Sequence, residues 1–477
     1  MLLCLLLTAC GGGGGSGDAA LAGGGAGPAP TPASVDRSGN AVGTVTGFGS
    51  VFVNGVEYET DGATITRDGS NALERDLRIG QVVMVTGTRD ESGTRGTATR
   101  ISFDDNVEGP IESIDLAGSR FVVLGQTVLV DASTVFDDRI PTASLAGLAV
   151  GGIVEVSGFV HASGDILATR IEPRAAGTEF EVRGVVSELD AGARRFSLGT
   201  LRVDYANATL ADFDGAGIAN GQLVEVKGTR LVGGLLAATR IEREGRSLLP
   251  GNGQMTELEG FVTRFASATD FEVSGQPVRT TATTTYRGGT AASLAFGVKV
   301  EVEGNVDAGV LVARTVHIKS RSNARISGRV QAVDAAGGQL TVLGVTIGID
   351  ATTQFEDNAD SRVSSFNLGR ISTGDYVEVR GRAGTGTVDL VASRIERDDA
   401  DDDSEVRGAV ESIADGSIVI LGVTANISAG TRFEGRNGLP VTRAEFLAAL
   451  RTGDIAKAKG TEAGTSALEA EEVELED

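Results

Sequence analysis

Histidine, cysteine, tyrosine and tryptophan are all scarce in this sequence, whose 477 residues include two His, two Cys, four Tyr and no Trp. Two histidines leave little material for histidine-based metal centres or acid–base sites repeated along the chain. The shortage of tryptophan and tyrosine removes the aromatic surfaces on which bases and sugars usually stack. Basic residues are also a minority, because 42 Lys and Arg against 65 Asp and Glu give a net charge of −23. This charge opposes a phosphate backbone, so we expect no nucleic-acid partner.

Common catalytic signatures are missing as well. The sequence contains no G-x-S-x-G nucleophile motif, no H-E-x-x-H zinc motif and no G-K-[ST] phosphate motif. His161 and His317 occupy positions that do not recur elsewhere in the chain, and we expect them to be surface or strand residues. We therefore expect no cofactor.

The amino terminus predicts an export signal. The apolar run from Leu2 to Ala9 is far shorter than the roughly 20 residues of a membrane-spanning helix, which is typical of a signal peptide. Leu7-Thr8-Ala9-Cys10 resembles the lipobox of bacterial lipoproteins, and this resemblance implies that residues 1–10 are signal and lipobox, with Cys10 the lipidated residue. By the same resemblance, Gly11 after the cysteine implies the outer membrane, facing the periplasm or the surface. The alternative is a chance cysteine within a signal peptide.

The segment 11–39 is rich in Gly, Ala and Pro and carries almost no charge, so it cannot bury enough apolar surface to fold. We expect a flexible tether with a reach of about 30 Å. Removal of Cys4 and lipidation of Cys10 would leave no thiol for a disulfide, and the fold would then depend on packing alone.

One pattern, G-x-x-V-x-V-x-G, recurs six times along the chain, with alanines replacing the valines in the last copy. Because the copies lie 70 to 79 residues apart, each marks a small domain rather than one turn of a solenoid. The six copies begin at Gly80, Gly151, Gly221, Gly297, Gly374 and Gly453. The predicted domains are 40–105, 106–175, 176–247, 254–320, 323–399 and 403–477.

Each domain shows five segments of period-2 alternation separated by turn glycines, the pattern of half-buried strands. A variable stretch separates the third strand from the fourth; in the last domain Thr442 and Glu445 form a capping box that predicts a helix there. This order is that of a five-stranded OB-like barrel, although an open meander would give the same string. The predicted fold class is therefore all-β, a tandem array of six small five-stranded antiparallel OB-like β-barrel domains with short helices or loops between strands three and four.

The fourth strands place valines such as Val154 and Val156 on one face, which we expect to be core. Ala456 and Ala458 take these positions in the sixth domain and would bury fewer methylene groups. We expect the sixth domain to be the least stable unless its helix compensates.

The recurring strings x-V-x-G-x-V, V-L-G-x-T-V-x-V-D-A-x-T-x-F, G-x-x-V-E-V-x-G and A-T-R-I-E resemble a bacterial family known as domain of unknown function 5666. The resemblance covers nearly all of residues 40 to 477. It implies tandem copies on a lipoprotein and brings no activity with it, so it assigns no catalytic residue.

Charged residues recur on the solvent side of the fourth and last strands. If these strands pair directly, a glutamate in one faces an arginine in the other, forming structural cross-strand pairs; the alternative is a repeated anion site. The expected pairs are Glu155 with Arg170, Glu225 with Arg240, and Glu378 with Arg394.

An acidic segment lies between the fifth and sixth domains and contains Asp398, Asp399, Asp401, Asp402, Asp403 and Glu405. Oxygen-rich clusters attract Ca²⁺, which makes these residues weak candidates for a metal site. The spacing matches no EF-hand, and a solvated, self-repelling linker is the preferred interpretation.

Repetition without a catalytic constellation predicts a non-enzymatic, lipid-anchored cell-envelope protein that serves as a multi-module binding or spacer array. We expect it to be monomeric, with an envelope protein or polysaccharide as its possible partner. The alternative is an envelope hydrolase that uses a carboxylate pair in one domain.

Overall fold

The computed structural model describes residues 37–475 apart from 91–92, 117, 132, 214, 246, 320–323, 351–352, 361–362, 364–365, 385 and 437–438. The predicted signal, the lipidation site Cys10 and nearly all of the predicted tether lie outside the described residues. In the described part, no helix is both long and apolar enough to cross a membrane.

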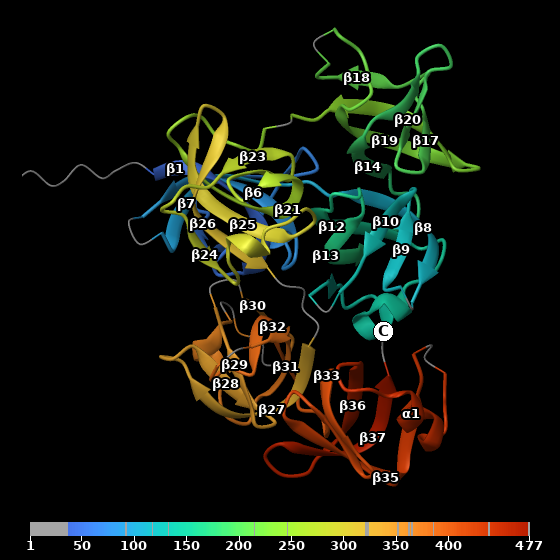
Figure 1. The fold of residues 1–477 in the computed structure, drawn as a ribbon. Helices are drawn as coiled ribbons and strands as arrows, with labels where there is room; N and C mark the ends of the chain where they lie inside the picture. Colours follow the sequence, from blue (N-terminus) through green and yellow to red (C-terminus); the bar gives the residue numbers. More distant parts are fainter. Residues whose placement is uncertain are drawn as a thin grey trace, which may run out of the picture. The chain divides into compact units, whose positions relative to one another are not determined.

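The described chain is almost entirely β-structure and divides into six repeats (Figure 1). Repeat one contains β1 (Arg37–Gly47), β2 (Val51–Val53), β3 (Val56–Glu59), β4 (Thr64–Arg67), β5 (Ser70–Ala72), β6 (Val82–Arg89) and β7 (Arg95–Phe103). Repeat two contains β8 (Val107–Asp115), β9 (Arg120–Val123), β10 (Gln126–Leu129), β11 (Val135–Phe136), β12 (Ile153–Val160) and β13 (Ile166–Pro173). Repeat three contains β14 (Phe180–Val185), β15 (Ser187–Asp190), β16 (Arg195–Leu198), β17 (Leu201–Asp204), β18 (Thr209–Ala211), β19 (Leu223–Val232) and β20 (Leu235–Arg243).

The second half of the chain continues the same order. Repeat four contains β21 (Met255–Ser267), β22 (Asp270–Val273), β23 (Gln276–Arg279), β24 (Thr285–Arg287), β25 (Lys299–Asp307) and β26 (Val310–Lys319). Repeat five contains β27 (Ala324–Asp334), β28 (Gln339–Val342), β29 (Val345–Gly348), β30 (Gln354–Asp357), β31 (Tyr376–Ala383) and β32 (Leu390–Asp398). Repeat six contains β33 (Asp403–Ala414), β34 (Ser417–Ile420), β35 (Val423–Glu434), β36 (Ile455–Glu462) and β37 (Ala467–Leu475).

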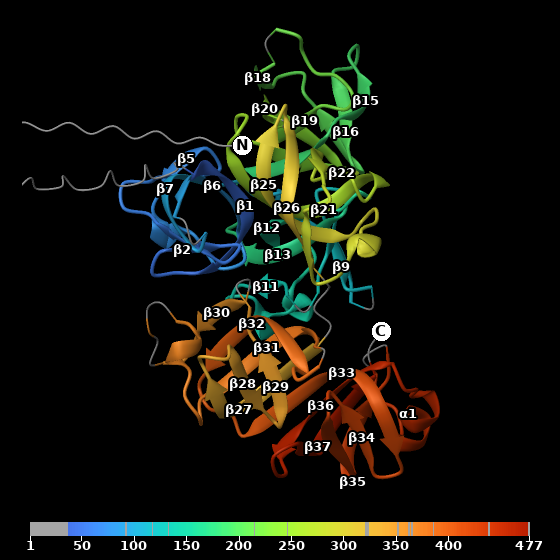
Figure 2. The ribbon, with the colours of Figure 1, turned by 60° about the vertical axis from the view of Figure 1, so that its left-hand side comes forward.

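The first four repeats are closed five-stranded barrels. In repeat one β1 pairs with β2, β2 with β3, β3 with β7, β7 with β6, and β6 with β1, which completes the ring (Figure 2). The strands of repeats five and six pair in the same cyclic order. The predicted all-β, OB-like architecture is confirmed.

One part of the fold prediction needs correction, because the strands of each repeat are not all antiparallel. The third and last strands pair in parallel, as in β10 with β13 and β29 with β32. A closed ring of alternating directions needs an even number of strands, so five strands must leave one neighbouring pair parallel. The long connection between strands three and four makes room in the chain for this parallel pairing.

Among the described residues, this connection holds short helical segments in five repeats. They are the 3-10 turns η1 (Glu74–Asp76), η2 (Pro141–Ala143), η3 (Leu145–Gly147), η4 (Ala291–Ser293) and η5 (Leu368–Arg370), and the helix α1 (Arg443–Ala449) in repeat six. The predicted capping box is present at α1, where the Thr442 hydroxyl accepts from the backbone N–H of Glu445. Phe446 on α1 is buried and its ring packs 5.1 Å from that of Phe433 on β35.

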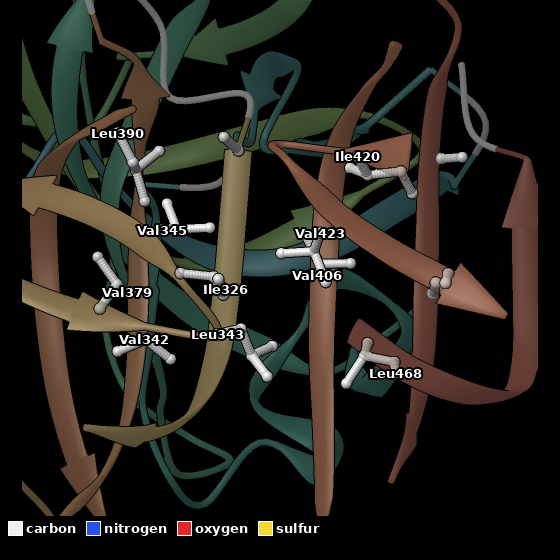
Figure 3. Packing of buried hydrophobic residues seen from close by; sticks show 14 of the residues in the cluster. Ile326, Val342, Leu343, Val345, Val379, Leu390, Val406, Ile420, Val423 and Leu468 are labelled. Atoms are coloured by element: carbon white, nitrogen blue, oxygen red, sulfur yellow. The ribbon is translucent and has the colours of Figure 1, made fainter. Parts of the chain in front are cut away.

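Two of the apolar cores each span a pair of repeats. One buried cluster joins residues of repeats two and three, and another joins repeats five and six. Figure 3 shows the latter, with Ile326 on β27 and Val406 on β33 among side chains from both repeats. The predicted core valines Val154 and Val156 are buried, as are Ala456 and Ala458 of repeat six.

Candidate functional site: paired repeats and a buried carboxylate cluster

The two glycines of the recurring motif are required for different structural reasons. The first has a positive φ in all six repeats, between 79° and 95°, which favours glycine over residues with a Cβ. The second lies against the last strand, where the main-chain oxygen opposite leaves no room for a Cβ. That oxygen would lie 2.0 to 2.6 Å from a Cβ added at Gly87, Gly158, Gly228, Gly304, Gly381 or Gly460. The motif is therefore a requirement of the barrel and not a ligand-binding loop.

The first strands join the repeats in pairs. In repeats two and three β8 and β14 pair antiparallel with Val107 opposite Val182, and in repeats five and six β27 and β33 pair with Ile326 opposite Val406. All four side chains are fully buried. Strand two pairs only with the carboxyl-terminal half of strand one. The pairing between repeats covers the amino-terminal half and so removes an exposed sheet edge.

Repeats one and four are joined in the same region although they are distant in sequence. Here β1 and β21 run parallel, from Gly39 opposite Met255 to Val42 opposite Leu258. The main-chain oxygen of Met255 would lie 1.8 Å from a Cβ on Gly39, so the close approach requires glycine there. Arg89 and Glu257 form a buried ion pair across this junction.

The predicted register of the charged cross-strand pairs is wrong. Glu155 lies opposite Glu172, Glu225 opposite Glu242, and Glu378 opposite Glu396. The arginines Arg170, Arg240 and Arg394 lie on the same face, one step further along, opposite Ser157, Lys227 and Arg380. Alternation fixes the face of a side chain, but the hairpin turn and a bulge at the second motif glycine fix the register.

The three glutamates bind cations mainly from first strands and neighbouring repeats. Glu155 pairs with Arg67 of repeat one at 2.5 Å, and Glu225 with Lys227 at 2.9 Å and with Arg183 at 3.5 Å. Glu378 pairs with Arg325 of β27 and, at 2.5 Å, with Arg380. Burial opposes ionisation of Glu378, but these arginines outweigh it and lower its pKa to about 2.

The three arginines are also occupied by carboxylates. Arg170 contacts Glu172 and lies 3.0 Å from Asp137; Arg240 lies 2.6 Å from Glu242. Arg394 contacts Glu356 and lies 3.1 Å from Glu396. These pairings favour the structural interpretation over a repeated anion site.

The acidic segment between repeats five and six does not converge on a point. Asp401 and Asp402 are exposed, Asp399 accepts from the backbone N–H of Asp360 at 3.1 Å, and Asp403 pairs with Lys459 at 3.2 Å. Glu405 lies 3.5 Å from Arg325, and burial raises the pKa of Asp398 to about 6. Within the described residues, the groups of acidic side chains close enough to share a metal ion lie elsewhere.

The two histidines lie in separate surroundings. His161 packs edge-on against Phe261, with ring centroids 5.0 Å apart, and its Nδ1 lies 2.8 Å from the hydroxyl of Ser163. His317 lies on β26 opposite Glu301, where burial lowers its pKa.

A carboxylate cluster that sequence reasoning missed lies at the junction of repeats one, two and three. It comprises Asp68 in the β4–β5 turn, Asp105 between β7 and β8, Glu108 on β8, Glu155 on β12 and Glu181 on β14. Two groups of three have ligand oxygens within 4.8 Å of one another, and Asp105 belongs to both. The residues are scattered from 68 to 181, and each is unremarkable in its local sequence. The pairing of β8 with β14 brings Glu108 and Glu181 together, the pairing of β12 with β8 adds Glu155, and a hydrogen bond from the Asp105 backbone adds Asp68.

The fold and its repetition define a class of protein, in which tandem OB-like β-barrel repeats are joined by pairing of their first strands. The profile of the family described as "Domain of unknown function (DUF5666)" matches the chain six times, at residues 41–102, 108–172, 183–242, 259–317, 327–396 and 407–474. The chain belongs to this family. A comparison with curated proteins finds no match.

Proposed function

We propose that this protein is a non-enzymatic, lipid-anchored spacer of the cell envelope. The observation that carries the proposal is the pairing of first strands, which links repeats two and three, five and six, and one and four by main-chain hydrogen bonds. Freely swinging modules need no such shared sheets. A chain that must hold its repeats at a fixed distance or orientation benefits from these shared sheets.

The repeated charged positions support a spacer over a six-fold binding array. An array raises weak affinities only if each module offers the same exposed surface to a repetitive ligand. Here the recurring glutamates and arginines are each held by a charged partner of the same or a neighbouring repeat, as Glu155 is by Arg67 and Arg170 by Asp137. An envelope protein or polysaccharide remains the kind of partner we propose, bound at a surface particular to one repeat.

The hydrolase alternative finds little support in the carboxylate cluster. A glycosidase needs two carboxylates that flank an open cleft large enough for a sugar. Asp105, Glu108 and Glu155 are all buried, which leaves no access for a polymer.

The spacer proposal is tested by spin-label distance measurements on the full chain, with Cys4 and Cys10 replaced. Labels at Asp61→Cys in repeat one and Asn305→Cys in repeat four, both exposed, should give one narrow distance distribution. The pair Asp61→Cys and Thr99→Cys, within repeat one, supplies the width expected of a rigid body. A much broader distribution between repeats than within one would reject the spacer.

The anchor is tested separately. Cys10→Ala should move the protein from the membrane fraction to the soluble fraction and abolish incorporation of a labelled fatty acid, whereas Cys4→Ala should do neither. Retention of Cys10→Ala in membranes with unchanged labelling would reject lipidation at Cys10.

A further inference from the structure

Asp105 is an ionisable side chain buried where none of the described cationic side chains forms an ion pair with it. It is 1% exposed, and among the described residues neither of its carboxylate oxygens has a hydrogen-bond partner. The charged groups that act most strongly on it are all carboxylates: Glu181, Asp68, Glu155 and Glu108. Burial and these like charges raise the pKa of Asp105 well above its usual range.

Two neighbouring glutamates each keep one oxygen free. Arg174 holds Oε2 of Glu108 at 3.0 Å, and Lys227 holds Oε2 of Glu181 at 2.7 Å. The Oε1 atoms of both glutamates are buried and lack a partner in the described part of the protein. Each cation thus fixes the orientation of a carboxylate while leaving one oxygen available, the usual role of residues behind a metal ligand.

The remaining two carboxylates are more fully occupied. Asp68 Oδ1 accepts a 3.2 Å hydrogen bond from the backbone N–H of Asp105, which ties the β4–β5 turn to the segment between repeats one and two. Both oxygens of Glu155 are taken by Arg67, at 2.6 and 2.5 Å. Glu155 therefore contributes charge and position. Asp68 Oδ2 has only a longer contact, 3.6 Å from Arg67 Nε, and Asp68 is counted as a ligand because it lies close to Asp105 and Glu181.

The charge balance of the cluster matches a divalent cation. Five carboxylates, when ionised, are opposed by Arg67, Arg174 and Lys227, which leaves 3 − 5 = −2, and Lys227 is shared with Glu225 outside the cluster. Uncompensated charge of this size is costly in a buried site, and a bound metal ion is one of the ways in which proteins stabilise it.

We propose that Asp105, Asp68, Glu108 and Glu181 bind one Ca²⁺ ion at the junction of repeats one, two and three. Two features favour Ca²⁺. The donors are all carboxylate oxygens, which suits a hard cation and not zinc. Ca²⁺ accepts six to eight oxygen ligands in flexible geometry, which an irregular set of four protein carboxylates can supply, whereas Mg²⁺ usually binds one or two carboxylates and keeps several waters.

Such an ion would tie three repeats together, because its ligands come from the β4–β5 turn, the inter-repeat segment, β8 and β14. This inference goes beyond the proposed spacer function and does not depend on lipid anchoring.

The test is calcium titration calorimetry and thermal unfolding of the full chain after treatment with a chelator. Wild type should bind one Ca²⁺ at this site, and 1 mM Ca²⁺ should raise Tm by at least about 2 °C over the chelated protein. Mg²⁺ at the same concentration should give a smaller shift. Asp105→Asn removes a buried like charge, so it should melt at or above the chelated wild type and lose the Ca²⁺-dependent shift.

Asp402→Asn serves as the matched control, because it makes the same chemical change in the exposed acidic segment and should leave both readouts unchanged. Glu181→Gln should weaken binding at least tenfold. The proposal is overturned if wild type shows no heat and no Tm shift, if Asp105→Asn binds Ca²⁺ as wild type does, or if Mg²⁺ matches Ca²⁺.

Discussion

Gly158 and Leu167 lie so close across the hairpin of β12 and β13 that a Cβ on Gly158 would be 2.3 Å from the Leu167 main-chain oxygen. The equivalent contact recurs in all six repeats, at the second glycine of the motif. Neither strand can withdraw without breaking the ladder between them, which continues on both sides of the bulge.

Gly158→Ala should therefore destabilise the protein by roughly 2 to 3 kcal/mol, the usual cost of forcing extra atoms into a packed site. Urea denaturation measures the change. Gly416→Ala is the control, because nothing lies within 4 Å of its added Cβ and its φ is not in the positive range. It should change the free energy of unfolding by less than about 0.5 kcal/mol. Equal effects at the two positions would contradict the steric account.

Glu378 provides a prediction with a defined pH dependence. Its pKa is about 2 in the folded protein, below its value of 4.5 in an unfolded chain, because Arg380 and Arg325 favour the ionised form. A depressed pKa stabilises the fold above pH 4.5, and that contribution is lost as the pH falls through 4.5 toward 2. Glu378→Gln should cost roughly 2 to 3 kcal/mol at pH 7, and the difference from wild type should shrink toward zero near pH 2.

Chemical denaturation at several pH values between 3 and 8 measures this difference. Glu471→Gln, at an exposed position on β37, is the matched control and should show a small difference at every pH. A Glu378→Gln deficit that stays constant down to pH 3 would show that lost packing, and not ionisation, is responsible.

Part of this structure was predictable from the sequence because it depends on local pattern. Glycine spacing and alternating valines predict the strands, and Thr442 with Glu445 predicts the one α-helix of the described chain. Register was not predictable, because alternation cannot distinguish pairings that differ by two residues, and Glu155 therefore faces Glu172 instead of Arg170.

Contacts between repeats were even less accessible to sequence reasoning. Nothing near Gly39 indicates that its partner is Met255, more than 200 positions away, since a parallel pairing of two first strands leaves no turn signal. The carboxylate cluster has the same origin. Asp105 and Glu181 are separated by the whole of repeat two, and they become neighbours only when β8 pairs with β14.

Tyr376 links repeats five and six by a hydrogen bond that a conservative variant can remove. Its hydroxyl donates to the main-chain oxygen of Asp403 at 2.7 Å. Tyr376→Phe should cost about 1 kcal/mol and should increase hydrogen exchange at the start of β33 more than elsewhere. Tyr205→Phe, which keeps the packing of that ring on Phe196, is the comparison. Unchanged exchange at Asp403 and Ser404 would mean that the hydroxyl does not couple the two repeats.

Phe446 is expected to carry much of the stability of repeat six. Ala456 and Ala458 fill core positions that are valines in the other repeats, and the helix α1 adds Phe446 to the same buried cluster. Phe446 is 1% exposed and packs on Phe433, so Phe446→Ala should cost roughly 3 to 5 kcal/mol and expose β36 and β37 to hydrogen exchange. Phe296→Ala makes the same change at a residue that is 59% exposed and should cost less than about 0.5 kcal/mol. If Phe446→Ala leaves β36 as protected as in wild type, the helix does not compensate for the alanines, and the stability of repeat six must come from its pairing with repeat five.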